Sequence, residues 1–236
     1  MNENARISVV VPALDEERAL PDLLDGLLAC EGPLEVLVVD GGSGDRTIEI
    51  ARSYPGVRVL DGPRGRASQM NHGARAARGK ILWFLHADSR VPHGATRLIR
   101  DSLADPSVAL GAFRFSVDSP RPVFRLIEAG VRLRIAVFRL PYGDQGFFLR
   151  RRTFDEAGGF EEIPIMEDVH LVRSLRRRGR VVVLSQPLAT SPRRWGAGGI
   201  LAVTLRNVAL AVADRLGVSP RSLARSRPVE KNGKEP

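Results

Sequence analysis

The segment Ile81-Leu82-Trp83-Phe84-Leu85-His86-Ala87-Asp88-Ser89 changes abruptly from apolar to polar residues. A continuous apolar run is typical of a strand covered on both faces of a parallel sheet. The polar residues then mark the carboxyl end of the strand, where open α/β sheets bind their ligands. Asp88 is therefore a candidate for holding a metal ion and a diphosphate. Capping of a following helix explains the residue equally well when it is considered alone.

Shorter apolar runs precede this segment, and helical patterns separate them. The runs predict buried strands at residues 7–11, 34–39 and 57–60, the first of them ending at Pro12. Apolar residues at spacings of three and four predict helices at 20–28, 46–54 and 67–77, with Gly79 closing the third. Strands that alternate with helices predict an α/β fold with a doubly wound, mostly parallel sheet.

The second half of the chain is less regular and predicts a mixed sheet flanked by further helices. The predicted strands cover 108–117, as an edge or mixed strand, then 146–149 and 181–184. The predicted helices cover 123–137, 152–157, a stretch from Glu167 toward Gly179, and an apolar-rich stretch at 198–216. We expect one domain over residues 1–218 and a basic, Pro-containing mobile tail over 219–236.

Composition limits the location and the partners of the protein. The single cysteine excludes an internal disulfide, and residues 1–6 lack the pattern of a signal peptide, so we expect a cytoplasmic protein. There is no apolar stretch of the length of a spanning helix. The formal net charge of +9 favours anionic partners. The arginines do not alternate with aromatic residues as in single-strand binding surfaces, which argues against nucleic acid.

Further acidic residues follow the predicted strands. Asp40, after the second strand, could accept hydrogen bonds from a ribose or a base, or could be a simple turn residue. Asp15 and Glu16, after the first strand, could contact a nucleoside, although acids are also favoured in the first turn of a helix. His86 could support a metal site or could pack at the strand end. The glycines after Asp40 lack the spacing of a dinucleotide fingerprint, so NAD is disfavoured.

Two later segments carry charged residues of the kinds needed in catalysis. Glu167 and Asp168 stand at a predicted helix start behind an apolar stretch, which suits a base that accepts a hydroxyl proton, although a capping pair is common there. Arg193, Arg194 and Trp195 offer guanidinium groups for diphosphate oxygens beside an aromatic wall, or form a basic surface turn.

Taken together, the motifs resemble family 2 inverting glycosyltransferases of the GT-A fold over residues 6–216. The motifs are Pro12-x-x-Asp15-Glu16, Val38-Val39-Asp40-Gly41-Gly42-Ser43-x-Asp45-x-Thr47, Asn71-x-Gly73, His86-Ala87-Asp88, Gly143-Asp144-Gln145-Gly146, Glu167-Asp168 and Arg194-Trp195. The His-Ala-Asp sequence is similar to that of a branch of small bacterial enzymes. Many relatives carry Asp at the position of His86, so the identity of the metal is open.

The resemblance implies roles for individual positions. Asp168 would be the catalytic base, with Glu167 orienting it, and Asp88 would bind the metal, Mg²⁺ or Mn²⁺, with His86 as a further candidate ligand. The donor site, which would hold a nucleotide-sugar, would comprise Pro12, Asp15, Glu16, Asp40, Asn71, Asp88, Arg194 and Trp195. The acceptor would be a hydroxyl compound, activated for a single displacement with inversion.

The apolar stretch at 198–216 carries arginines beside its apolar face, which suits either a packed helix or one lying on a membrane. With the basic surface, this predicts weak peripheral association with an anionic membrane at the inner face of the plasma membrane and a lipid-linked or amphiphilic acceptor. Two other functions remain open: a sugar-phosphate nucleotidyltransferase, disfavoured by the absence of a glycine-rich loop after the first strand, and a non-catalytic nucleotide-sugar-binding protein.

Overall fold

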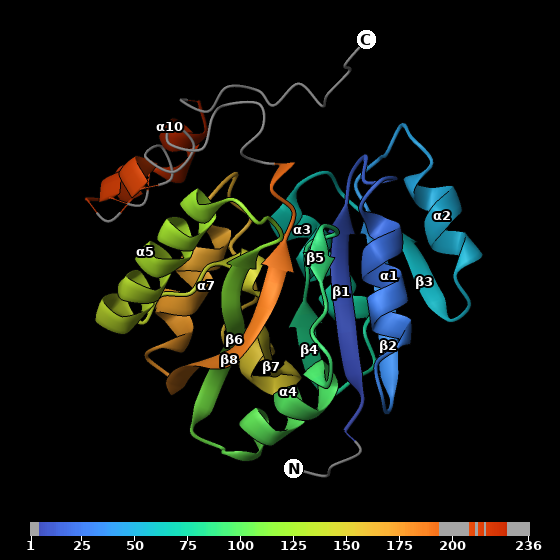
Figure 1. Ribbon diagram of the computed structural model, residues 1–236, viewed down its shortest axis with the longest axis horizontal. Helices are drawn as coiled ribbons and strands as arrows, with labels where there is room; N and C mark the ends of the chain where they lie inside the picture. The colour runs from blue at the N-terminus through green and yellow to red at the C-terminus, as the bar shows by residue number, and fades with distance from the viewer. Residues whose placement is uncertain (1–4, 194–207, 211, 215, 226–236) are drawn as a thin grey trace.

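The computed structural model describes residues 5–193, 208–210, 212–214 and 216–225. An eight-stranded sheet with the order β3-β2-β1-β4-β7-β6-β8-β5 lies between two layers of helices (Figure 1). The strands are β1 (Ile7–Ala13), β2 (Leu34–Asp40), β3 (Val57–Asp61), β4 (Ile81–Phe84), β5 (Ser89–Arg90), β6 (Val108–Val117), β7 (Phe148–Arg150) and β8 (Arg180–Thr190). The predicted α/β class and mostly parallel mixed sheet are confirmed.

Strands β1 to β4 form the parallel half that the alternating pattern predicts. Val9 is aligned with Val36 of β2 and with Trp83 of β4, and all three side chains are buried. β7 runs antiparallel to both β4 and β6, so β6 and β8 point in the same direction as the first four strands. The carboxyl ends of six strands therefore meet at one edge of the sheet.

Helices cover both faces because successive strand residues point to opposite sides. One face packs against α1 (Leu20–Leu28), α2 (Thr47–Ser53) and α4 (Ala95–Ala104). The other packs against α3 (Arg66–Ala76), α6 (Arg151–Glu156) and α7 (Glu167–Leu175). Outside these layers, α5 (Pro122–Phe138) contacts the end of β6, and the 3-10 turn η1 (Gly143–Gln145) precedes β7. A short α10 (Pro220–Arg225) follows near the C-terminus.

The first strand does not end at Pro12, as the sequence predicts, but continues to Ala13. Pairing with β4 stops at Val10, whereas pairing with β2 continues to Ala13. The Ala13 carbonyl accepts from Gly41 on the β2 side, so the nitrogen of Pro12 faces the β4 side, beyond the end of that ladder. No strand hydrogen bond is lost there through the missing N–H of proline. Pro12 therefore occupies a position equivalent to that of a proline on an edge strand.

Other boundaries also differ from the expectations. β6 is an internal strand between β7 and β8, and β8 extends well past Leu184 to Thr190 across a register shift. Gly79 does not close α3, which ends at Ala76. Instead, an added Cβ at Gly79 would lie 2.6 Å from the Arg6 carbonyl, so glycine permits close packing on β1.

The described part of the C-terminal region contains helical segments and a short turn between them. In the segment predicted as a helix at 198–216, residues 208–210 and 212–214 are helical, while 198–207, 211 and 215 lie outside the described residues. α10 begins within the segment expected to be a mobile tail, and its Leu223 packs with Ile165 and Leu210. Within the described part of the chain, no helix combines the length and apolar character needed to cross a bilayer.

Candidate functional site

The carboxyl edge of the sheet gathers the polar residues that follow its parallel strands. Asp15 and Glu16 follow β1, Asp40 ends β2, and His86 and Asp88 follow β4. Ser191 and Arg193 follow β8 and reach the same edge, because β8 is parallel to β6. The start of α7 also lies here, since that helix leads back to the opposite edge, where β8 begins.

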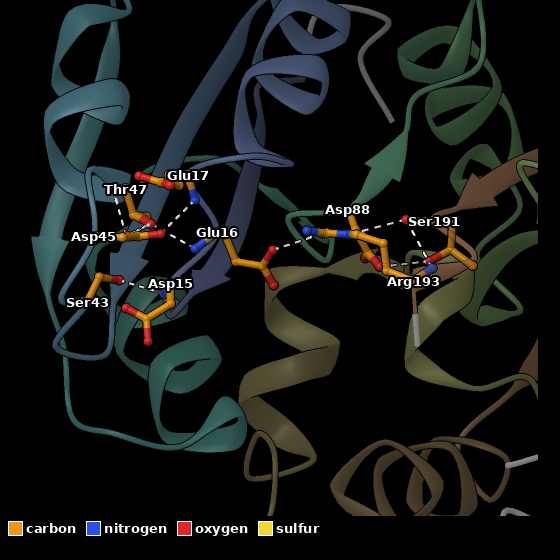
Figure 2. A network of polar contacts seen from close by, with 10 residues as sticks. Asp15, Glu16, Glu17, Ser43, Asp45, Thr47, Asp88, Ser191 and Arg193 are labelled. Carbon is orange, nitrogen blue, oxygen red and sulfur yellow. Dashed lines mark hydrogen bonds and ion pairs between the residues drawn. The ribbon is translucent and has the colours of Figure 1, made fainter. Parts of the chain in front are cut away.

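The loops after β1 and β2 are tied together by hydrogen bonds (Figure 2). The Asp15 N–H donates to Ser43 Oγ at 3.0 Å, and the Gly44 N–H donates to Asp15 Oδ1 at 2.7 Å. Asp40 is buried and accepts from the N–H groups of Gly42 and Ser43 and from the Ser43 hydroxyl. Asp40 thus uses three of the roughly four acceptor positions of a carboxylate to shape this loop.

Asp45 organises the backbone of the loops after β1 and β2. Its carboxylate accepts from the Thr47 N–H and hydroxyl, and also from the Glu17 N–H at 3.0 Å. Burial raises the pKa of Asp45, but the hydrogen bonds from Thr47 and Glu17 outweigh burial and lower it. Because the Glu16 N–H also donates to Thr47 Oγ1, at 2.8 Å, Asp45 and Thr47 together fix the backbone that carries Glu16.

Asp88 is half-buried at the end of the β4 segment and lies against residues from the far end of the chain. The Thr190 hydroxyl donates to Asp88 Oδ2 at 3.1 Å. Arg193 contacts Ser191 Oγ at 3.2 Å and Glu16 Oε2 at 3.1 Å, so it links the loop after β8 to the loop after β1 (Figure 2).

A small open pocket of about 160 Å³ borders Asp88. Charged residues from α1 and the loop before it, from β5, and from just after β6 and β8 contribute to its lining, namely Arg18, Asp22, Arg90, Asp118 and Arg193. A lining with positively and negatively charged side chains suits a charged, hydrated ligand better than an apolar ligand.

The predicted catalytic residues, Glu167 and Asp168, are the first two residues of α7. Met166, immediately before the helix, has φ of 70°, a strained conformation for a residue with a side chain. Asp168 is half-buried, and its Oδ2 accepts the Gly143 N–H at 2.8 Å. Gln145 holds η1 in place, since its side-chain amide donates to the Phe113 carbonyl at 2.8 Å.

Glu167 is 1% exposed and forms an ion pair with Arg66 at the start of α3. Desolvation lowers the pKa of the Arg66 guanidinium, but the carboxylates of Glu167, Asp168 and Asp144 outweigh it and raise that pKa. Arg66 is thus a permanent positive charge beside the three acids, and it links the α3 side of the edge to α7.

The remaining predicted residues differ in their placement. Pro12 lies near the carboxyl end of β1, and His86 is buried just after β4. Asn71 is also buried, and both ends of its amide bond the backbone of Phe160, which assigns it to holding that loop. Arg194 and Trp195 lie outside the described residues.

Sequence reasoning missed Arg66 and Thr190. Thr190 and Arg66 contact acids about a hundred positions away in the chain, and no local pattern marks such pairs. Arg193 belongs to the predicted diphosphate-binding segment, but no local pattern pairs it with Glu16.

The oxygen atoms at Asp88 and Thr190 are suitable ligands for a hard divalent cation. Among the residues that the structure describes, no three His, Cys, Asp or Glu side chains form a ready-made metal site. A single carboxylate beside a hydroxyl fits Mg²⁺ or Mn²⁺ shared with a ligand, because such ions use one or two protein carboxylates and take their other ligands from phosphates and water.

Comparison with known proteins gives consistent results. The model of the glycosyl transferase family 2 matches residues 8–161. A dolichyl-phosphate beta-glucosyltransferase of Drosophila melanogaster is 37% identical over 108 residues, which are 39% of this chain and 32% of that protein. The match thus spans about a third of that relative's length.

Solved structures share the architecture. A mannosyltransferase of Pyrobaculum calidifontis in complex with GDP-Man and Mn²⁺ aligns with a TM-score of 0.69 and 22% identity, over 94% of this chain and 67% of that one. The glucosyl-3-phosphoglycerate synthase of Mycobacterium tuberculosis, in complex with Mn²⁺, UDP and glucosyl-3-phosphoglycerate, aligns with a TM-score of 0.58 and 22% identity, over 91% and 81%.

Proposed function

The chain belongs to glycosyl transferase family 2 and has the GT-A fold, and from this premise we propose that it transfers a sugar from a nucleotide-diphosphate donor to an acceptor hydroxyl with inversion. The observation that carries the proposal is the gathering of strand-end acids and of the α7 acids at one edge of the sheet. Fold alone would not be enough, because related folds support several activities.

In the proposed donor site, Asp15, Glu16 and Asp40 contact the nucleoside, and Pro12 and Asn71 shape the loops around it. Asp40 retains about one acceptor position for a base N–H. Asp88, with His86 nearby, would hold a divalent cation that stabilises the charge of the departing diphosphate. Support for a metal comes from the Mn²⁺ in the complexes of two structural neighbours and from the oxygen ligands around Asp88. Arg194 and Trp195 are proposed to close over the phosphates.

In the proposed acceptor site, Asp168 accepts the proton of the acceptor hydroxyl while that oxygen attacks the anomeric carbon on the face opposite the diphosphate. A single displacement of this kind inverts the configuration and needs one base. Glu167 does not contact the reacting atoms in this proposal. Its ion pair with Arg66 positions the first turn of α7 and therefore the carboxylate of Asp168.

We further propose that the acceptor is lipid-linked or amphiphilic. Similarity to a dolichyl-phosphate glucosyltransferase supports this class, although the similarity covers only part of each chain. The acceptor of that relative is a lipid phosphate by name, and a long acyl or prenyl chain would have to remain in a membrane while its polar end enters the site.

A screen of UDP-, GDP- and TDP-sugars, each with and without Mn²⁺, tests the proposal. One donor should raise the melting temperature of the full chain, and the same donor should release nucleoside diphosphate during incubation. The anomeric configuration of the product, read by NMR, decides between inversion and retention. Release of pyrophosphate from a nucleoside triphosphate and a sugar phosphate would show a nucleotidyltransferase instead, and binding of a donor without any turnover would show a binding protein.

A further inference from the structure

Helix α5 presents an apolar stripe to the outside of the molecule. Val123, Leu126, Leu133 and Val137 are 37%, 74%, 66% and 61% exposed. Their spacings of three, seven and four residues place them on one side of the helix, with Gly130 between them. Exposed apolar residues that form a continuous patch mark interaction surfaces more often than scattered ones do.

The stripe is distinct from the face that attaches α5 to the sheet. Phe124 is buried against Phe115 and Val117, with Ile127 and Val131 beside them. Glu128 is 2% exposed and accepts from the Ser116 hydroxyl and the Val117 N–H, both at 2.9 Å. These contacts fix the rotation of the helix, so the outward stripe is a stable feature of its surface.

The charges around the stripe are almost all positive. Residues 121–139 contain five arginines and one acid, Glu128, which is buried and paired with Arg125. Arg121, Arg132 and Arg139 are exposed. An apolar stripe next to arginines is the composition of helices that lie in a membrane interface, where the apolar residues enter the acyl boundary and the guanidinium groups reach anionic head groups.

We propose that α5 docks the protein on an anionic phospholipid surface through the stripe of Val123, Leu126, Leu133 and Val137. A second copy of the chain fits the same surface less well. A symmetric contact through α5 would bring its arginines close to those of the partner, without acids to neutralise them. An anionic bilayer supplies the opposite charge along the whole helix.

Two successive contacts connect α5 to the proposed catalytic base. The Arg134 guanidinium of α5 lies 3.4 Å from the centre of the Tyr142 ring. The next residue, Gly143, donates its N–H to Asp168. A membrane bound along α5 would therefore lie close to the site where a lipid-linked acceptor must present its hydroxyl. This last step depends on the proposed function, whereas docking itself does not.

Co-sedimentation of the full chain with vesicles tests the inference. The vesicles contain phosphatidylcholine alone or phosphatidylcholine with about 30% phosphatidylglycerol, at low salt. The test variant combines Leu126→Gln, Leu133→Gln and Val137→Gln, all at exposed positions. The matched control is Leu28→Gln, which removes an exposed leucine, 52% accessible, from α1. Melting temperatures confirm that both variants fold.

We expect the wild type to bind the anionic vesicles and the triple variant to bind at least about tenfold more weakly, because each apolar side chain contributes to interfacial burial. Leu28→Gln should bind like the wild type. Equal binding by the triple variant, or no binding by the wild type, would overturn the inference. A wild-type dimer that the triple variant dissociates, without vesicle binding, would identify the stripe as a subunit interface instead.

The donor-induced shift in melting temperature is recorded in parallel and separates the two proposals. Vesicle binding without any donor response would leave docking intact and remove the proposed function. A donor response without vesicle binding would support the proposed function and overturn the docking inference.

Discussion

Two backbone N–H groups hold the carboxylate of Asp168 at the start of α7. Gly143 donates to Oδ2 and Val169 to Oδ1, both at 2.8 Å. Each oxygen keeps further acceptor capacity, so a hydroxyl group can approach a carboxylate whose orientation is already fixed. Preorganisation of this kind is what a general base requires.

Replacing Asp168 with Asn should lower turnover by about 10²-fold or more, because the amide cannot accept the proton. Donor binding should remain close to that of the wild type, since no donor contact is lost. Turnover and the donor dissociation constant are measured separately. Full turnover by the variant would remove Asp168 from the role of base.

Replacing Arg66 with Gln should lower the free energy of unfolding by about 2 kcal/mol, because the buried Glu167 loses its partner. Arg66 is itself 39% exposed, which keeps the loss below that of a fully buried pair. Urea denaturation measures the change. The control is Arg152→Gln, which breaks the exposed pair with Glu156 and should change stability by less than about 0.5 kcal/mol. Equal losses in the two variants would contradict the structural role of Arg66.

At the scale of residues, the sequence predicts acids better than their partners. Asp15, Asp40 and Asp88 stand out because each follows an apolar strand. Arg66 does not, because it is one of many arginines and its contact with Glu167 bridges 101 positions. The side-chain amide of Asn71 bonds the backbone of Phe160, a pairing that only the folded chain creates.

At the scale of elements, α3 packs closely on the sheet at Gly73. A Cβ added there would lie 2.4 Å from Val10 Cγ1 and 2.9 Å from Val39 Cγ2. Gly73→Ala should therefore destabilise the protein by about 1–3 kcal/mol through overpacking, as measured by thermal or urea unfolding. The control is Gly130→Ala in α5, where nothing lies within 4 Å and a small gain in stability is expected. A neutral effect at Gly73 would mean that α3 can move away from β1.

A histidine joins α7 to the C-terminal region. His170 contacts Glu161 at 2.6 Å and Asp214 at 3.1 Å, and Arg173 also pairs with Asp214. Burial lowers the pKa of His170, but the two carboxylates outweigh it and raise the pKa above its ordinary value. The charged form therefore stabilises the folded state.

This stabilisation should be complete below the ordinary histidine pKa and lost as the pH rises through the raised value. The free energy of unfolding should consequently fall between mildly acidic and alkaline pH, and it should fall less in a His170→Gln variant. Urea denaturation over this pH range measures both. Identical pH profiles would show that the two carboxylates do not favour the charged imidazole.

The periodic elements follow from the sequence, and the irregular ones do not. The apolar segments that alternate with helices predict β1 to β4 with small errors, because each strand is a local run of apolar residues. β1, β2 and β4 are buried on both faces, whereas β3 is a half-buried edge strand. β8 continues past Leu184 through polar residues and Pro187, because β6 pairs with it across a register shift. The two-residue β5 has no periodicity to detect and exists through its pairing with Thr190 and Ala189.

At the scale of the whole molecule, ligand binding should be visible as stability. If Asp88 holds the cation, the donor should raise the melting temperature more with Mn²⁺ than with EDTA. Asp88→Asn should remove the metal-dependent part of the shift and keep the part due to the nucleoside. An unchanged metal response in the variant would place the cation elsewhere. The exposed Asp101→Asn, on α4, is the control.

The order of the strands is the part of the fold that the sequence patterns do not predict. Helix and strand periodicity indicate a parallel α/β sheet, but the insertion of β7 between β4 and β6 follows from contacts between distant segments. Phe148 of β7 is aligned with both Trp83 and Gly111. A glycine at position 111 leaves room for the Phe148 ring, which lies 2.0 Å from the place of an added Cβ.

The contact between Asp88 and Thr190 joins positions 102 residues apart. During synthesis, the first half of the chain leaves the ribosome well before its partner strands exist. Closing so long a loop is slow and comes late in folding. A nascent polypeptide that ends before Thr190 would therefore carry Asp88 without the hydroxyl group that it contacts, and competence to handle a donor would arise only after β8 has been made.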